Sequence, residues 1–522
     1  MPAPLFPGAD GLGLRRWTIA VVGCVFAVWA GATLADSPYL VFAGLAGLLY
    51  VGTLAVNARA LAWLVIALQP AALIVPFFPG RPFWWELCAL LAWPSLLAYG
   101  LVNRQKLTDL KFDHLERRAL LALVGYMAVL VMIMLVRGVG FRAFGGGQMG
   151  GRMYAQQLVL AVLPPLMLVA QFTRRQLLSA VIAGWLLTLT YLLAELSFSS
   201  GGGVMQKILY FIELPVDGLN FELGYVVTGL RRYGSFAAVG FAGFSFIWMI
   251  RPLRDLFGGW SWLAVPAMLG LFLLGLGSGY RNMLIIPVVA FGFLTLFQRF
   301  WTIGRIVSAV AFVTVIIGVL YIAADKLPLP VQRSVSFIPG IEVAQIAKNN
   351  AATTNADRLE VIMLAVNDIP KYWFAGRGFG MERLDQAPLD PLSGGAELLY
   401  AQGMFYNGLF GSLLKTGLPG LLCMLVFSWY VSKMAIELIK LVQRRSVGEQ
   451  DGFDRLCFVL CAQWFAYLVH YYLTNGDVNF WMQNFGITGG LIMICRRILA
   501  EVVETVPPEI TPHADIVGTA LK

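Results

Sequence analysis

The stretch LFLLGLGSGYRNMLIIPVVAF, residues 271 to 291, decides the fold of this chain. It places a short polar turn with Ser278 and Arg281 between two apolar runs. Such runs recur along nearly the whole chain, and a bilayer-spanning helix needs about 20 mostly apolar residues. The hydrophobic fraction is 59% and the charged fraction 13%, about half the charge of a soluble domain. The sequence therefore predicts an all-α polytopic membrane protein.

We count about 14 apolar runs and predict about 12 to 14 transmembrane helices. They are centred on residues 17–35, 39–56, 60–78, 84–102, 119–136, 154–172, 177–196, 235–250, 260–277, 283–298, 305–323, 408–431, 455–473 and 482–495. The first run follows Arg15 and Arg16 and ends in ATLA, a pattern also typical of a signal peptide, although the run is longer than usual for one.

The basic residues predict the orientation, because cytoplasmic loops retain Lys and Arg. With both termini in the cytoplasm, basic residues concentrate in the cytoplasmic segments, such as 103–118 and KLVQRR at 440–445. This topology places residues 137–153, 197–234 and 324–407 outside. It also accounts for the net charge of +9 without a nucleic-acid partner.

The topology divides the chain into four parts. Residues 1–323 hold eleven transmembrane helices in the fourteen-helix count, about 20 residues each, and residues 324–407 form a large, partly helical outer loop. Residues 408–499 hold the last three helices, and residues 500–522 form a cytoplasmic tail. No cofactor is predicted, because the sequence shows no zinc, aspartate-rich, Walker or dinucleotide motif. The six cysteines all lie inside predicted helices, where packing is their expected role.

The large outer loop contains a predicted amphipathic helix. Its apolar residues repeat at helical spacing: Leu359, Ile362, Met363, Val366 and Ile369. Thr354 or Asn355 is predicted to cap its start and Pro370 to end it. We expect this helix on the membrane surface, with Trp373 and Phe374 near the interface.

Three arginines at the predicted outer surface are candidate ligands for phosphate. Arg281 lies in the polar turn at the outer end of the span predicted at 283–298, and Arg231 and Arg232 lie just before another apolar run. The guanidinium fork suits phosphate oxygens, and the small residue Ser278 would let the turn approach them closely. The alternative is that these arginines only extend to lipid headgroups.

The order of motifs over residues 228 to 425 resembles the O-antigen ligase and polymerase family of integral-membrane glycosyltransferases. That family has an arginine in an amphipathic outer helix, a proline, a Gly-x-Gly, a His-Asn where the next helix begins, and a Gly-Leu-Pro-Gly inside that helix. These places are taken here by Arg358, Pro370, Gly376 with Gly378, Tyr406 with Asn407, and GLPG at 417–420. Tyr406 departs from the family's histidine, and a tyrosine with a pKa near 10 is a poor base at neutral pH.

The resemblance implies a GT-C-like enzyme of the bacterial inner membrane with a periplasmic active site. Such enzymes transfer a glycan from an undecaprenyl diphosphate-linked donor to a hydroxyl acceptor, on a glycan or a lipid, without a metal. Membrane lipid and polysaccharide-assembly proteins are the other partners it implies. The missing histidine favours a polymerase of surface polysaccharide over an O-antigen ligase. A transporter of lipid-linked sugars or other anions, and a structural subunit of an export complex, are the alternatives.

The resemblance also suggests roles for individual residues. Arg281 would stabilise the departing diphosphate together with Arg231 or Arg232. Arg358 would contribute to substrate binding, and Tyr406 and Asn407 would line the acceptor or carrier site. A base must accept the proton of the acceptor hydroxyl. His470, in YLVHYYLTNGDVNFW, is one candidate, and the outer carboxylates Glu397, Asp217 and Glu222 are the others.

Overall fold

The structure, a computed structural model, describes residues 47, 58–76, 81–102, 112–138, 150–199, 209–212, 233–255, 263–379, 396–401, 403–445 and 450–505. These residues form helices and contain two isolated β-bridges but no strand. The helices of four or more residues are Ala58–Leu68, α3 (Trp84–Val102), α5 (His114–Arg137), α6 (Gly151–Leu160), α7 (Leu163–Ala170), α8 (Arg174–Leu187), α9 (Leu189–Ser199), α12 (Gly234–Ile250), α13 (Ala264–Gly277), α14 (Arg281–Phe297), α15 (Ile303–Ala323), α16 (Leu329–Val335), α17 (Gln345–Tyr372), α18 (Ala396–Ala401), α19 (Gly408–Gln443), α20 (Gly452–Val469), η6 (His470–Asn475), η8 (Met482–Gly486) and α21 (Ile487–Thr505). Of these, η6 and η8 are single π-helical turns.

Five helical segments of the described chain are long and apolar enough to cross a membrane, as expected for an all-α membrane protein. They are His114–Arg137, Gly151–Ala170, Arg174–Glu195, Gly408–Gln443 and Gly452–Thr474.

Three predicted spans differ from the helices that form. The span predicted at 60–78 ends at Leu68, because Pro70 follows and the chain turns into the two bridges. The spans at 154–172 and 177–196 correspond to the segments Gly151–Ala170 and Arg174–Glu195, but each contains an interruption, the first where α7 begins with two prolines and the second at Thr188. The two spans predicted before residue 58 lie almost wholly outside the described residues.

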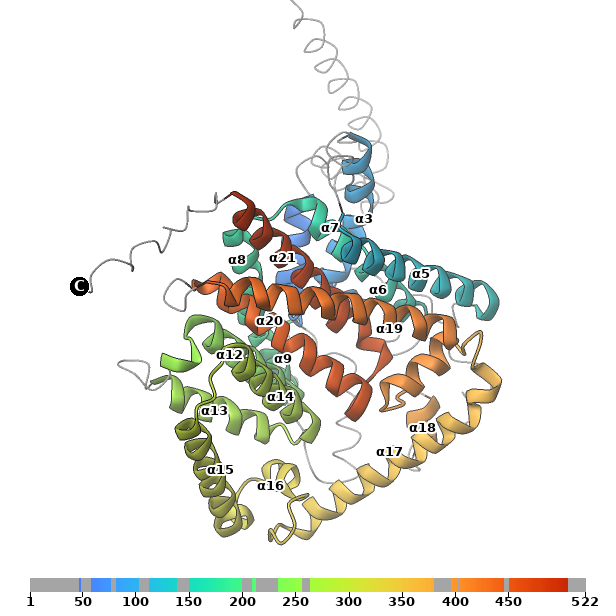
Figure 1. The fold of residues 1–522 in the computed structure, drawn as a ribbon. Coiled ribbons are helices and arrows are strands. Elements are labelled where there is room, and N and C mark those ends of the chain that lie inside the picture. The colour runs from blue at the N-terminus through green and yellow to red at the C-terminus, as the bar shows by residue number, and fades with distance from the viewer. Residues whose placement is uncertain are drawn as a thin grey trace, which may run out of the picture.

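Helix α19 is the central element. It packs against α5, α20 and α21, and α14 packs against α20 (Figure 1). The core between them is aromatic: Phe427, Trp464, Trp481 and Phe485 make ring contacts with centroids 5.3 to 6.4 Å apart. Each such pair adds about 0.5–1.5 kcal/mol beyond burial.

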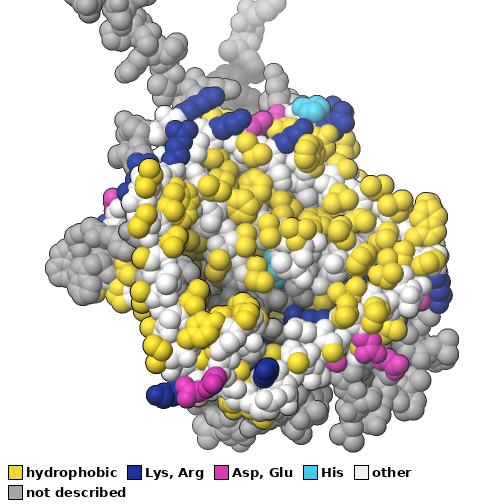
Figure 2. All heavy atoms as spheres, turned by 60° about the horizontal axis from the view of Figure 1, so that its bottom comes forward, with side chains coloured by type: hydrophobic (Ala, Val, Ile, Leu, Met, Phe, Trp, Pro, Cys, Tyr) yellow, Lys and Arg dark blue, Asp and Glu magenta, His cyan; other side chains and the backbone are white. Residues whose placement is uncertain are grey.

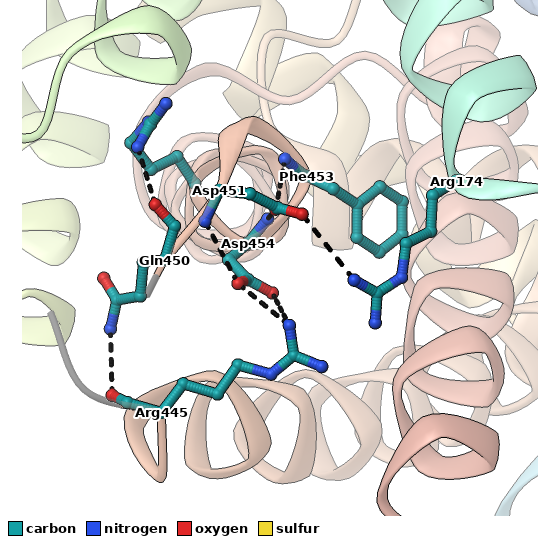
Figure 3. A network of polar contacts seen from close by, with 7 residues as sticks. Arg174, Arg445, Gln450, Asp451, Phe453 and Asp454 are labelled. Carbon is teal, nitrogen blue, oxygen red and sulfur yellow. Dashed lines mark hydrogen bonds and ion pairs between the residues drawn. The ribbon is translucent and has the colours of Figure 1, made fainter. Parts of the chain in front are cut away.

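A network of ion pairs joins α8, α19 and α20 at one end of the molecule (Figure 3). The Arg445 guanidinium donates to the buried Asp454 carboxylate at 3.1 Å, and Arg174 pairs with Asp451 at 3.6 Å. Asp451 also caps α20 by accepting from the amides of Phe453 and Asp454. All these residues were predicted to be cytoplasmic, and we call this end the Arg445 end.

Helix α17 runs along the edge of the molecule beside α18, where α19 begins (Figure 1). We call this the α17 end. Leu359, Met363 and Val366 of the predicted apolar stripe are exposed, as are Trp373 and Phe374. An exposed apolar stripe next to an aromatic pair favours the predicted position at a lipid interface.

The boundaries predicted for this helix are wrong. It begins at Gln345, so Thr354 and Asn355 lie inside it and neither caps its start. Alanines Ala347 and Ala351, one turn apart, are buried and favour the additional turns. Pro370 lies within the last turn and not after it, because a proline so near the end removes only one helical hydrogen bond.

Candidate functional site

The site is built around a break in helix α19. Gly417 has φ 66° and ψ 179° inside the helix, and Pro419 has no N–H to donate to the Lys415 carbonyl. The segment 373–379 supplies the missing partners. Arg377 N donates to Leu414 O at 2.6 Å, Gly378 N donates to Lys415 O at 2.9 Å, and Leu418 N donates to Trp373 O at 2.7 Å.

The glycines of both motifs make this docking possible. Gly376, Gly378 and Gly417 all have positive φ, a conformation that disfavours a side chain. A Cβ at Gly376 would also lie 2.6 Å from the Lys415 carbonyl oxygen, and one at Gly417 would overlap that of Phe374. The Gly-x-Gly and Gly-Leu-Pro-Gly motifs, forty residues apart in sequence, are therefore two halves of one contact.

Helices α5 and α6 hold the other side of the same segment. The Tyr154 hydroxyl accepts from Phe379 N at 2.9 Å, and Gly150 N donates to Phe379 O at 2.7 Å. Arg137 Nε donates to Gly376 O at 3.3 Å. The backbone of 376–379 is thus fixed from two directions, so a side chain it carries has a defined position.

Three of the predicted site residues meet at the α17 end. The Arg358 guanidinium lies over the Tyr406 ring at 4.9 Å, and Arg358 is close enough to His470 for their charges to interact. His470 begins the π-helical turn η6, and its Nε2 is buried without a hydrogen-bond partner among the described residues. Tyr406 has φ 52°, a strained conformation for a residue other than glycine. π-Turns and strained residues are both frequent at functional sites.

Further basic and aromatic side chains lie beside this cluster. Arg377, 9% exposed, lies over the Tyr400 ring at 5.2 Å, and the Tyr400 hydroxyl donates to Asp368. Burial and this hydrogen bond raise the pKa of Tyr400 above its ordinary value, so Tyr400 stays a neutral donor. Lys415 of α19 is 3% exposed, with its ammonium 5.1 Å from the centroid of the Phe379 ring. Figure 2 shows a hollowed face with basic side chains at its edge.

Two other predicted residues have plainer surroundings. The Asn407 side chain caps α19 by accepting from Leu409 N at 3.0 Å and Phe410 N at 3.1 Å. It therefore has a structural role whether or not it contacts a ligand. Glu397 is exposed on the short helix α18.

The turn between α13 and α14, which contains Ser278, is anchored in the protein. Ser278 is buried, its hydroxyl accepts from Tyr280 N at 3.1 Å, and its carbonyl accepts from Tyr233 N at 3.0 Å. The Arg333 guanidinium donates to the Gly279 carbonyl and to Asn350 Oδ1, the latter at 2.6 Å, which ties the turn to α17.

The phosphate-binding role predicted for Arg281, Arg231 and Arg232 stays a prediction. Arg281 is the first residue of α14, which packs against η6, but its side chain is outside the described part. Arg231, Arg232, Asp217 and Glu222 also lie outside the described residues.

Four polar residues of the site were not predicted from the sequence: the buried cations Arg377 and Lys415, the half-buried carboxylate Asp477 and the buried amide Asn479. Arg377 lies within the quoted Gly-x-Gly, Lys415 precedes GLPG, and Asp477 and Asn479 follow His470. A signal existed for Lys415, because an ionisable residue inside an apolar helix is by default a candidate functional residue.

Among the residues the structure describes, no group of three or more His, Cys, Asp or Glu side chains is placed to hold a metal ion. Compared with known proteins, the chain matches no family model and no curated protein.

Proposed function

We propose that this chain is a membrane glycosyltransferase that transfers a glycan from an undecaprenyl diphosphate-linked donor to a hydroxyl acceptor outside the cytoplasmic membrane. The observation that carries the proposal is the meeting of Arg358, Tyr406 and His470 at the α17 end. They come from α17, from the residue before the cap of α19, and from η6. Two of them occupy places in the motif order that resembles the O-antigen ligase and polymerase family.

The proposed chemistry assigns a role to each of these groups. The acceptor oxygen attacks the anomeric carbon of the donor sugar, and the bond from that carbon to the diphosphate oxygen breaks. The departing diphosphate gains negative charge, which Arg358, and Arg281 from the start of α14, would stabilise. His470 Nε2 would accept the proton of the acceptor hydroxyl. His470 is preferred over Glu397, because Glu397 is exposed on α18 whereas His470 Nε2 is buried and makes no hydrogen bond within the described part of the chain.

The proposal includes a GT-C-like architecture of about 14 spans in a bacterial inner membrane. Tyr406, in place of the family's histidine, favours a polymerase that joins repeat units over a ligase that modifies lipid A core. The glycans that accumulate in cells lacking the protein distinguish the two. Single lipid-linked repeat units are expected for a polymerase, and long carrier-linked chains would indicate a ligase.

One observation favours a transporter as a second candidate. Transporters bind substrate at broken helices with charged groups nearby, and α19 is broken at Gly417 next to the buried Lys415. The break lies about 14 Å along the helix from its start, which is close to the middle of a bilayer core about 30 Å thick for a span that begins at Gly408, so its position is compatible with a transporter as well. Reconstituted protein that forms new glycosidic bonds supports the enzyme, and movement of lipid-linked glycan across vesicles without such bonds supports the transporter.

The topology makes a first prediction. A cysteine at the exposed position Glu342 should react with a membrane-impermeant maleimide in intact cells, whereas one at the exposed position Arg444 should react only after permeabilisation. The reason is the concentration of basic residues at the Arg445 end. The unaltered protein is the control, because its six native cysteines lie in predicted helices. The reverse labelling pattern would move the site to the cytoplasm and contradict the proposal.

A second prediction concerns the Tyr406 hydroxyl. Tyr406→Phe keeps the ring beneath Arg358, and the hydroxyl lies 3.7 Å from Met404 Sδ, a weak acceptor. The variant should keep at least about a tenth of the transfer rate, since a neutral hydrogen bond contributes about 0.5–1.5 kcal/mol. Tyr406→Ala, which removes the ring as well, should be slower. A folded Tyr406→Phe protein without any transfer would show that the hydroxyl takes part in the reaction.

A further inference from the structure

Lys415 is a buried cation inside the membrane-spanning helix α19, about 10 Å along the axis from its start. Its ammonium lies 5.1 Å from the centroid of the Phe379 ring and 5.5 Å from that of Phe405. A lysine is rarely retained in such surroundings without a role, since burying its charge is costly.

The ammonium bonds to the loop that follows η6. Lys415 Nζ donates to Asn479 Oδ1 at 2.6 Å. The Asp477 carboxylate accepts from Asn479 N at 2.9 Å and from Asn479 Nδ2 at 3.5 Å. Burial raises the pKa of Asp477, and Lys415 and the Asn479 amides partly offset this. A chain of hydrogen bonds thus runs from Lys415, next to the break in α19, to Asn479 and Asp477 in the loop 476–480.

This loop is packed against the beginning of α19. A Cβ at Gly476 would lie 2.7 Å from the Cα of Gly408, and a Cβ at Gly408 would overlap the Tyr471 carbonyl. The Ser412 and Tyr471 hydroxyls are 2.6 Å apart. Since Tyr471 adjoins His470 and Gly408 follows Asn407, this contact determines where His470 lies relative to Tyr406.

The ammonium also faces the turn before Tyr406. Gly403 has φ 72°, and a Cβ there would lie 2.9 Å from Lys415 Nζ. Lys415 therefore touches the segments that lead to both Tyr406 and His470, while neither of these residues contacts its ammonium in the hydrogen bonds of the described chain.

We propose that Lys415 is a positioning residue of the transfer site: by holding Asn479 and the 476–480 loop on α19, it fixes His470 relative to Tyr406 and Arg358. This inference rests on the proposed function for its catalytic consequence, but its structural part is measurable without any donor. Lysine is required there because an apolar replacement leaves Asn479 Oδ1 without a donor and Asp477 without a nearby cation.

Amide hydrogen exchange of the full-length protein in detergent micelles tests the structural part. In Lys415→Met, exchange of residues 476–480 should rise by at least about tenfold, because breaking a buried charge network costs several kcal/mol. Adding Asp477→Asn should recover part of the protection, since it removes the isolated charge and keeps an oxygen for the Asn479 amide. Lys433→Met, at an exposed lysine of the same helix, is the matched control and should leave the loop unchanged.

The same variants are then assayed for transfer. Lys415→Met should lower kcat with little change in KM for the lipid-linked donor, because Lys415 is 3% exposed and the proposal gives it no contact with the donor. If Lys415→Met does not fold, Asn479→Ala removes the same bond without removing a charge and should give the same exchange increase.

Unchanged exchange of the loop in the folded Lys415→Met or Asn479→Ala protein would overturn the proposal, as would raised exchange with a normal kcat. An unaltered protein that transfers no glycan would instead contradict the proposed function, and the exchange experiment would still decide the structural role of Lys415.

Discussion

Replacement of Arg358 by alanine is expected to slow glycan transfer about 100- to 1000-fold, the loss typical of removing one donor that stabilises a developing oxyanion. The guanidinium lies over the Tyr406 ring, and its charge acts on His470, so in the proposed site it is held where the diphosphate would depart. Arg358→Lys should recover only part of the rate, because lysine keeps the charge but loses the planar fork. The measurement is transfer from lipid-linked donor by purified protein.

Arg305→Ala is the matched control for this variant. Arg305 lies over the Phe300 ring at 4.6 Å and donates to the Phe300 carbonyl at 2.8 Å, a comparable arginine–aromatic contact in a segment predicted to be cytoplasmic. Its loss should leave transfer unchanged. A folded Arg358→Ala protein that works at the normal rate would remove Arg358 from the site and leave it as an interfacial arginine of α17.

Gly417→Ala is expected to destabilise the protein by about 2–5 kcal/mol, which combines about 1–2 kcal/mol for a left-handed backbone with about 1–3 kcal/mol for overpacking. The new methyl would overlap the Phe374 carbonyl oxygen and lie 2.9 Å from Gly376 N. These are backbone atoms that cannot move without separating 373–379 from α19. Thermal unfolding in detergent measures the effect, with the fraction of protein that stays monodisperse recorded at each temperature.

Two glycine controls separate the causes of this loss. Gly138 has φ 76° and open space where an added methyl would lie, so Gly138→Ala tests the backbone cost alone and should destabilise by about 1–2 kcal/mol. Gly292 lies inside α14 with open space and ordinary helical φ, so Gly292→Ala should be neutral or stabilising by up to about 1 kcal/mol. A Gly417→Ala protein as stable as the Gly138→Ala protein would show that the docking of 373–379 is loose.

Much of the helical framework could be predicted from sequence because apolar length is a local property. The predicted spans at 84–102, 119–136 and 305–323 each coincide with a helix, α3, α5 and α15. Helix ends and breaks were less predictable. The start of α17 and the interruption at Thr188 depend on packing and hydrogen bonds that the apolar pattern does not contain.

The sequence by itself determined the apolar helices, the concentration of basic residues at one end, and the candidates Arg358, Tyr406 and His470, because each is a matter of residue type and local order. Only the tertiary structure decided that these three meet, that Asn407 is a helix cap, and that Gly376 docks on the break at Gly417. The buried role of Lys415 also emerged only there, since its partner Asn479 is sixty-four residues away in sequence. The physical reason is that a hydrogen bond or a close backbone contact depends on distances in space, and residues far apart along the chain acquire those distances only when the helices have packed.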